Sequence, residues 1–345
     1  NNTAIGMDAM KANTTGTGNT AVGAIALDAI TTTSNNTAVG HEALTNATGG
    51  SGNTSIGKGT MTADVTGSNN TALGYTALAA NTTASNNVAI GHNALVVNST
   101  GAKNTAVGTN ALDANTTANN NTAIGYGALT ANTTGASNVA AGLEALKTNT
   151  TGASNIAIGV GALENNTTAS FNVAIGHDAG LSNTTGAENV AVGYQAFDAN
   201  TTGGTNVAIG YIALGANTTG SSNVAVGPYA LDANTTASNN TAVGNAALGA
   251  NTTGGGAVAV GAYALDAQTT ADNNTAVGHQ ALTGATTGGN NTAIGTNALM
   301  VNSTGSGNVA IGKDAADAYT ANNITAVGLN AATAATTGGG NVAVR

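Results

Sequence analysis

A glycine recurs every seventeen residues along this chain, and this spacing restricts the possible folds more than any other feature. The series runs from Gly6 to Gly312 without a linker or a change in composition. One interval is a residue shorter, from Gly312 to Gly328, and Arg345 occupies the last position of the series. Short periods of this kind are typical of β-helical coils, in which each repeat packs on its neighbours. The sequence therefore predicts a single repeat domain over residues 1–345, with about twenty coils.

The three residues before each repeating glycine have the pattern of a short β-strand. The first is β-branched in every repeat, the second is Ala except at Ser55, and the third is Val, Ile or Leu except at Ala141. Alternation along a strand places the first and third residues on one face and the Ala on the other. A second apolar segment of Ala and Leu follows each glycine. This segment is compatible with either a short strand or one helical turn.

Identical residues at equivalent positions predict that the coils stack in register, about 4.8 Å apart. An Asn precedes nearly every strand, and we expect these side-chain amides to bond along the stack, as at Asn87, Asn104 and Asn121. The glycine after each strand requires either a positive φ or a position without space for a side chain. Such glycines include Gly91, Gly108 and Gly125. The predicted fold is all-β, a parallel β-solenoid of the β-roll or β-helix type.

The composition excludes several classes of function. Only 6% of residues are charged, and a net charge of −9 offers no basic surface for nucleic acid. No segment approaches the ~20 apolar residues of a membrane span. The acidic residues that recur after the glycines are too widely spaced to pair as a catalytic acid and base. They are Asp28, Asp113, Asp198, Asp232 and Asp266. We therefore expect no enzymatic activity, no cofactor and no metal site.

Both faces of the predicted strand are apolar, with Val, Ile or Thr on one and Ala on the other. A short coil encloses only one interior, so one of these faces must look outward along the whole stack. A continuous apolar ribbon exceeds the surface patch that a monomer tolerates. We expect a second copy of the chain, aligned in parallel, to cover it. The alternative is a monomer whose Thr residues make the outer face less apolar.

Aromatic and His residues gather one or two positions after the repeating glycine. The densest run is His177, Tyr194, Tyr211 and Tyr229. Aromatic side chains are frequent anchors in contact surfaces, so this run is the candidate surface-contact edge. The same positions also accept residues such as Leu143, and the alternative is an exposed corner that tolerates any side chain.

The triplet N-x-S/T recurs in nearly every coil, for example at Asn98 and Asn217. In an exporting cell such triplets can accept a glycan. The alternative, which we favour, is that Asn and Thr are present because they cap turns and bond the local backbone.

The N-V-A-I-G segments resemble the head repeats of trimeric autotransporter adhesins, at Asn87–Gly91, Asn172–Gly176 and Asn206–Gly210. The longer pattern at Asn104–Thr117 and Asn240–Gly254 is similar to repeats of bacterial surface fibres and phage tail-fibre proteins. The resemblance implies left-handed parallel β-rolls that assemble as homotrimers outside the cell or on a virion. It also implies attachment to a host-surface glycan or protein receptor.

The predicted function is an extracellular structural or adhesive fibre, such as an adhesin head, a shaft or a tail-fibre segment, which acts as a stiff rod for surface attachment. Neither end of the chain carries a distinct cap, so we expect it to be part of a longer chain. Two alternatives are a subunit that polymerises end to end into an extracellular filament, and an ice-binding solenoid that presents a lattice of Thr and Asn.

Overall fold

A computed structural model describes residues 1–345 as short parallel strands connected by turns. The chain divides into two compact units, Asn1–Phe171 and Asn172–Arg345, and each is described by itself. Both units are parallel β-solenoids with a seventeen-residue repeat, so the predicted fold class and period are confirmed. The assignment of residues 1–345 to one domain stays a prediction. No helix long and apolar enough to cross a bilayer is present.

Each coil contributes one strand of three residues. The first unit contains β1 (Thr3–Ile5), β2 (Thr20–Val22), β3 (Thr37–Val39), β4 (Thr54–Ile56), β5 (Thr71–Leu73), β6 (Val88–Ile90), β7 (Thr105–Val107), β8 (Thr122–Ile124), β9 (Val139–Ala141) and β10 (Ile156–Ile158). The second unit contains β11 (Val173–Ile175), β12 (Val190–Val192), β13 (Val207–Ile209), β14 (Val224–Val226), β15 (Thr241–Val243), β16 (Val258–Val260), β17 (Thr275–Val277), β18 (Thr292–Ile294), β19 (Val309–Ile311), β20 (Thr325–Val327) and β21 (Val342–Val344).

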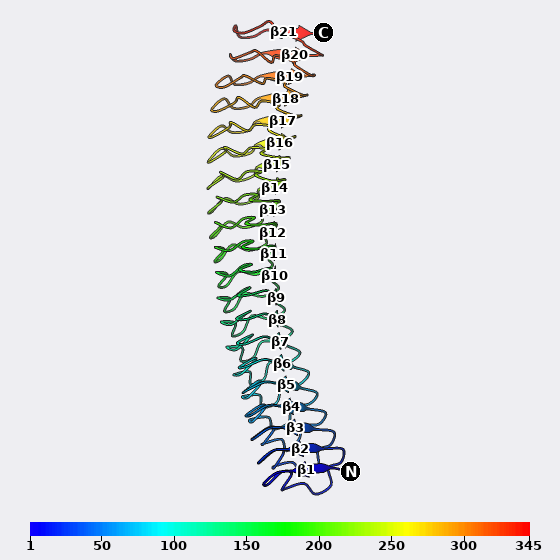
Figure 1. The fold of residues 1–345 in the computed structure, drawn as a ribbon. Helices are drawn as coiled ribbons and strands as arrows, with labels where there is room; N and C mark the ends of the chain where they lie inside the picture. Colours follow the sequence, from blue (N-terminus) through cyan, green and yellow to red (C-terminus); the bar gives the residue numbers. More distant parts are fainter. The chain divides into compact units, whose positions relative to one another are not determined.

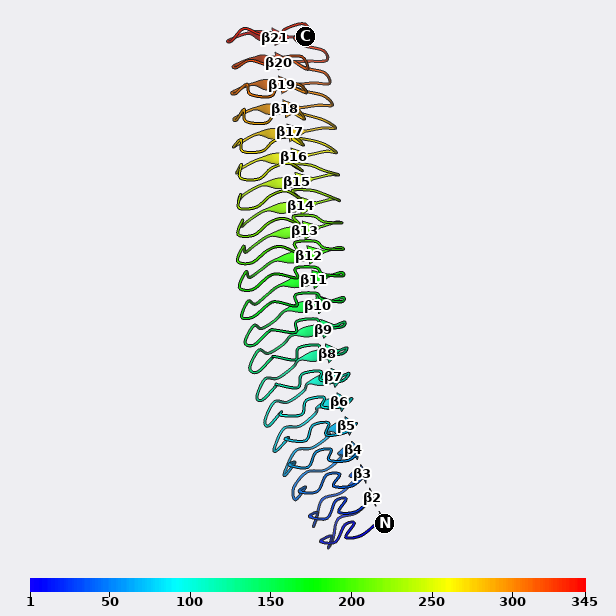
Figure 2. The ribbon, with the colours of Figure 1, turned by 60° about the vertical axis from the view of Figure 1, so that its left-hand side comes forward.

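Successive strands pair in parallel, and equivalent residues oppose each other without a shift of register. In the first unit Val88 of β6 pairs with Thr105 of β7. In the second unit Val207 of β13 pairs with Val224 of β14. Within each unit the coils lie one above another and the strands form one column (Figures 1 and 2). Equivalent side chains therefore repeat along each unit as columns.

The core of each coil consists of small side chains and one larger one. The middle Ala of the strand points inward, together with the Ala and Leu that follow the glycine. In the coil of β7 these residues are Ala106, Ala111 and Leu112, and none of them has exposed surface. The outer strand residues, Thr105 and Val107, are half-buried. The Ala face is therefore the interior, and the face of Thr, Val and Ile looks outward.

The apolar segment after the glycine is neither a strand nor a helical turn, so both predicted alternatives are wrong. Asn110 and Leu112 have φ angles of 57° and 53°. The Asn110 N–H donates to the carbonyl of His92 in the preceding coil at 3.0 Å, and the Leu112 N–H donates to that of Ala128 in the next at 3.0 Å. A left-handed conformation costs a non-glycine residue about 1–2 kcal/mol. Leu burial and these axial hydrogen bonds offset that cost.

The Asn before each strand bonds to the backbone of the next coil. The backbone N–H of Asn104 donates to Oδ1 of Asn87 at 2.9 Å, and Nδ2 of Asn87 donates to the carbonyl of Gly101 at 2.9 Å. The N–H of Asn121 likewise donates to Oδ1 of Asn104 at 2.9 Å. This column follows the stack axis as expected, but its main partners are backbone groups and not other amides.

A second Asn column, in the Asn-Thr-Thr turn, forms the ladder of side-chain amides. Nδ2 of Asn98 donates to Oδ1 of Asn81 at 3.3 Å, and Nδ2 of Asn115 donates to Oδ1 of Asn98 at 2.8 Å. Nδ2 of Asn98 also donates to the carbonyl of Gly101 within its own turn at 2.9 Å. These side chains are fully buried, so each column satisfies polar groups that water does not reach.

The repeating glycine meets both requirements that the sequence suggested as alternatives. Gly91 has a φ of +134°, and a Cβ added to it would lie 2.5 Å from the carbonyl oxygen of Gly108 in the next coil. Gly108 and Gly125 both have a φ of +135°. The corner of the coil therefore needs glycine for its backbone conformation and also for the close stacking of the next corner.

Candidate functional site

The aromatic run predicted as a contact edge forms a continuous row of rings in the second unit. The ring centroids of His177 and Tyr194 are 5.5 Å apart, those of Tyr194 and Tyr211 are 5.5 Å apart, and those of Tyr211 and Tyr229 are 5.3 Å apart. The first two pairs are stacked, with interplanar angles of 23° and 10°, and the third is edge-on at 74°. The in-register stacking of the coils produces this row, because each ring follows the corner glycine of its own coil.

This row is accessible to solvent. Tyr194, Tyr211 and Tyr229 are exposed by 45%, 45% and 41%. Nδ1 of His177 lies 3.0 Å from a carboxylate oxygen of Asp178 at the edge of the row. Exposed rings held at a fixed spacing can contact the flat apolar face of a ligand, and the Tyr hydroxyl groups can form hydrogen bonds with it.

Single pairs of aromatic rings are in contact in other coils. Tyr75 and His92 stack in the first unit, with centroids 5.6 Å apart. Tyr263 and His279 form an edge-on pair in the second unit, with centroids 6.2 Å apart. The position after the glycine therefore produces a ring contact wherever neighbouring coils both carry an aromatic residue there.

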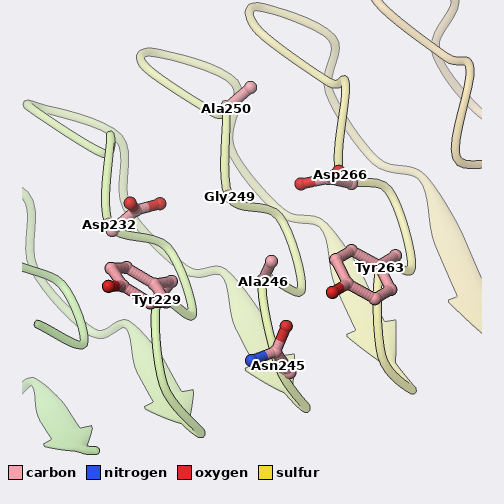
Figure 3. A pocket seen from close by; sticks show the side chains of 8 residues that line it. All are labelled: Tyr229, Asp232, Asn245, Ala246, Gly249, Ala250, Tyr263 and Asp266. Atoms are coloured by element: carbon pink, nitrogen blue, oxygen red, sulfur yellow. The ribbon is translucent and has the colours of Figure 1, made fainter. Parts of the chain in front are cut away.

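A recess that the sequence did not predict lies beside Tyr229. Its volume is about 540 Å³, and it is lined by Tyr229, Asp232, Asn245, Ala246, Gly249, Ala250, Tyr263 and Asp266. In Figure 3 the two Tyr rings lie on either side of Ala246, and the two Asp side chains lie on either side of Gly249. Three consecutive coils form this site. The middle coil has small residues where both neighbouring coils have large ones.

Asp232 and Asp266 approach the same point above the middle coil. A Cβ added to Gly249 would lie 3.4 Å from Oδ1 of Asp232 and 2.9 Å from Oδ1 of Asp266. The two oxygens can therefore be no further apart than the sum of these distances. Burial raises the pKa of both carboxyls, and the negative charge of Asp266 raises the pKa of Asp232 further. Neither carboxylate forms an ion pair with a basic residue of the chain.

The same position in other coils is also partly desolvated. Burial raises the pKa of the carboxyls of Asp28, Asp113 and Asp198. The sequence contains the signal for the recess in this column, because Asp and Gly alternate from Asp198 through Asp232 to Asp266. The Asp residues are too widely spaced for a catalytic pair, but the small residue between them leaves the space of the recess.

A second, smaller recess occurs in the first unit and lacks aromatic walls. It has a volume of about 380 Å³ and is lined by Ile25, Glu42, Thr45, Asn46 and Thr62. No group of three or more His, Asp or Glu residues is placed to hold a metal ion. Of these two recesses, the one beside Tyr229 therefore combines aromatic residues with charge.

The Asn of an N-x-S/T triplet is inside the coil in most of the Asn-Thr-Thr turns, whereas it is exposed in triplets such as Asn35–Thr37 and Asn46–Thr48. Asn98 and Asn217 have no exposed surface, and the side chain of each bonds to its own turn and to a neighbouring coil. A glycan cannot be attached to these amides in the folded chain. This geometry favours the interpretation in which Asn and Thr shape the turn.

Comparison with known proteins gives no further assignment. No protein family matches this sequence, and no curated protein is similar to it. The structure and its chemistry define the class as a parallel β-solenoid repeat protein.

Proposed function

We propose that the chain is a structural and adhesive segment of an extracellular fibre, displayed on a cell or virion surface, and that it has no catalytic role. In this proposal the coils are left-handed, and copies of the chain associate in parallel as a homotrimer. The exposed aromatic row contacts a host-surface glycan or a protein receptor.

One observation supports this proposal above the others, namely the apolar ribbon on the outer face of the strands. The last residue of each strand points outward, and Ile175, Ile209 and Ile294 in the second unit are each exposed by 39%. Eleven coils at a rise of about 4.8 Å make a ribbon about 50 Å long, and two outward residues per strand make it about 10 Å wide. A patch of about 500 Å² is at the upper end of what a monomer exposes.

A second copy of the same chain is a suitable cover for this ribbon. Two such ribbons in contact bury about 1,000 Å² in one unit alone, which is the lower limit for a biological interface. Parallel copies with the same repeat spacing also align every layer with a matching layer. Because the ribbon contains almost no charge, its burial carries little desolvation cost.

The oligomeric state tests this proposal directly. Native mass spectrometry and sedimentation of the purified chain should give a multiple of the 32.6 kDa chain mass, with three copies expected. The double variant Ile175→Lys/Ile209→Lys places two charges on the ribbon and should dissociate the assembly. Thr185→Lys/Thr202→Lys adds the same charges at exposed turn positions in the same unit and should leave the mass unchanged. A wild-type chain that stays monomeric at all concentrations contradicts the proposal.

Electron microscopy tests the fibre itself. Stiff, thin rods of uniform width are expected, whereas compact particles would contradict a fibre. The same images distinguish the alternative of an end-to-end polymer, which would give filaments of increasing length at higher concentration.

The ice-binding alternative receives less support from the side chains. In the Asn-Thr-Thr turn the hydroxyl of Thr82 donates to the carbonyl of Ser99 in the next coil at 3.0 Å, while Thr83 is exposed. One Thr of each pair is therefore occupied by the stack. Absence of thermal hysteresis at micromolar protein would remove this alternative.

A further inference from the structure

The aromatic row of the second unit has a gap of one coil. Six of seven consecutive coils carry a ring one or two positions after the corner glycine, and the coil of Gly244 carries Asn245 and Ala246 instead. The rings are those of His177, Tyr194, Tyr211, Tyr229, Tyr263 and His279. The recess beside Tyr229 is this gap, and Ala246 forms part of its wall (Figure 3).

The gap has the dimensions of one missing layer. Tyr229 and Tyr263 are two coils apart, which corresponds to about 9.6 Å at the rise of a parallel stack. A planar group placed midway is then about 4.8 Å along the stack from each of the two coils that carry the rings. That spacing lies within the range for contacts between planar groups, including edge-on contacts of the kind that Tyr211 and Tyr229 make with each other. A flat guest would therefore complete the row.

The charge of the recess selects the kind of guest. Asp232 and Asp266 approach the position of the missing Gly249 side chain from both sides, and no Lys or Arg lines the recess. Two carboxylates that repel each other and have no internal counter-ion favour a cation. The remaining polar side chain, Asn245, has an amide that can accept or donate a hydrogen bond.

We propose that this recess binds a guanidinium group, as presented by an arginine side chain of a partner protein. The guanidinium is planar, it stacks on aromatic faces, and its N–H donors point in several directions within one plane. It can therefore donate to Asp232 on one side and to Asp266 on the other while it lies between the Tyr rings. An ammonium group lacks the flat shape, and Ca²⁺ requires six to eight oxygen ligands, more than this recess supplies.

Ligand-observed NMR tests the proposal on the full-length chain. Saturation transfer to Nα-acetyl-arginine amide should be clear at millimolar ligand. Transfer to Nα-acetyl-lysine amide and to methyl glucoside should be at least about fivefold weaker, because neither is a planar cation. Addition of 5 mM CaCl₂ should leave the arginine signal in place, whereas complete competition by Ca²⁺ would overturn the proposal in favour of a metal site.

Two variants examine the two walls of the recess. Ala246→Tyr fills the gap with the same residue type that the two neighbouring coils have at this position, Tyr229 and Tyr263. The backbone accommodates it, because the φ angles of these Tyr residues are 56° and 59° and that of Ala246 is 51°. Asp232→Asn/Asp266→Asn removes the charges and keeps the shape. Each should reduce the arginine signal at least about fivefold. Asn110→Tyr, at the equivalent position of a first-unit coil, is the matched control and should leave the signal unchanged.

Circular dichroism checks that the variants are folded. A folded Ala246→Tyr chain that binds the arginine amide as well as the wild type does would refute the site. Equal binding of the glucoside and the arginine amide would also overturn it, and would indicate a carbohydrate site. These outcomes are independent of the oligomeric state, so the fibre proposal can fail or succeed separately.

Discussion

Asp64 occupies a position where most coils have an Asn of the buried amide ladder, and it lies between Ala47 of the preceding coil and Asn81 of the next. It has no exposed surface, its Oδ1 accepts a hydrogen bond from the N–H of Gly67 at 2.8 Å, and its Oδ2 has no partner. Burial raises the pKa of this carboxyl to about 7, from 3.8. The substitution Asp64→Asn replaces the acid by the side chain that this column otherwise uses, as at Asn81 and Asn98.

The magnitude follows from the raised pKa. A shift of about three units corresponds to about 4 kcal/mol between the protonated and the ionised forms. Because the folded chain binds this proton more tightly than the unfolded chain, Asp64 does not lower the free energy of unfolding below pH 4, where the carboxyl is protonated in both states. The free energy of unfolding falls as pH rises toward 7, and is lowest above pH 7. Asp64→Asn should therefore stabilise the chain by up to about 4 kcal/mol at pH 8, and by much less at pH 4.

Urea denaturation followed by circular dichroism, at pH 4, 6 and 8, measures this difference. Glu188→Gln is the matched control, because it also converts a carboxylate to an amide but at an exposed position. Its effect should be small at every pH. If the stability gained by Asp64→Asn is the same at pH 4 and pH 8, then ionisation of the Asp64 carboxyl does not lower the free energy of unfolding. That result would refute the reasoning.

Two further predictions concern the corner and the core of the coil. Gly108→Ala should cost at least about 3 kcal/mol in thermal melting, because the new Cβ meets the Gly125 carbonyl and the φ of +135° is restricted to glycine. Gly255→Ala should cost less than half as much, because its Cβ would lie 3.2 Å from the nearest atom, the carbonyl oxygen of Ser238, and other coils already have Ala at this position. Leu112→Ala should cost about 2–4 kcal/mol in the same assay, because the side chain is fully buried, whereas Leu143→Ala, which is 47% exposed, should change stability by less than about 0.5 kcal/mol.

Each comparison has an outcome that contradicts it. Equal melting temperatures for Gly108→Ala and Gly255→Ala would mean that the corner does not need glycine. A larger loss for Leu143→Ala than for Leu112→Ala would place the core on the wrong side of the coil.

The candidate site was predictable in part. The run from His177 to Tyr229 is visible in the sequence because each ring is one or two positions after the repeating glycine of its coil, and stacking in register then determines the neighbours. The recess beside Tyr229 was not predicted, because it depends on small residues. Ala246 and Gly249 carry no chemical signal of their own, and they form a site only where large side chains lie in the coils on both sides.

The sequence by itself determined the period, the position of each strand and the parallel stacking in register. These follow from identical columns, since a shift of register would remove the match between equivalent residues in every coil at once. It also identified the glycine corner, because no other residue recurs there with the same regularity.

Only the tertiary structure decided which strand face is the interior and how the second segment folds. Val107 and Ala106 are both apolar, and the choice between them depends on the space left inside a coil that already contains Leu112. The left-handed conformation of Leu112 opposes its local preference. It is adopted because the hydrogen bond to Ala128 in the next coil and the burial of the side chain exist only after the coils have stacked.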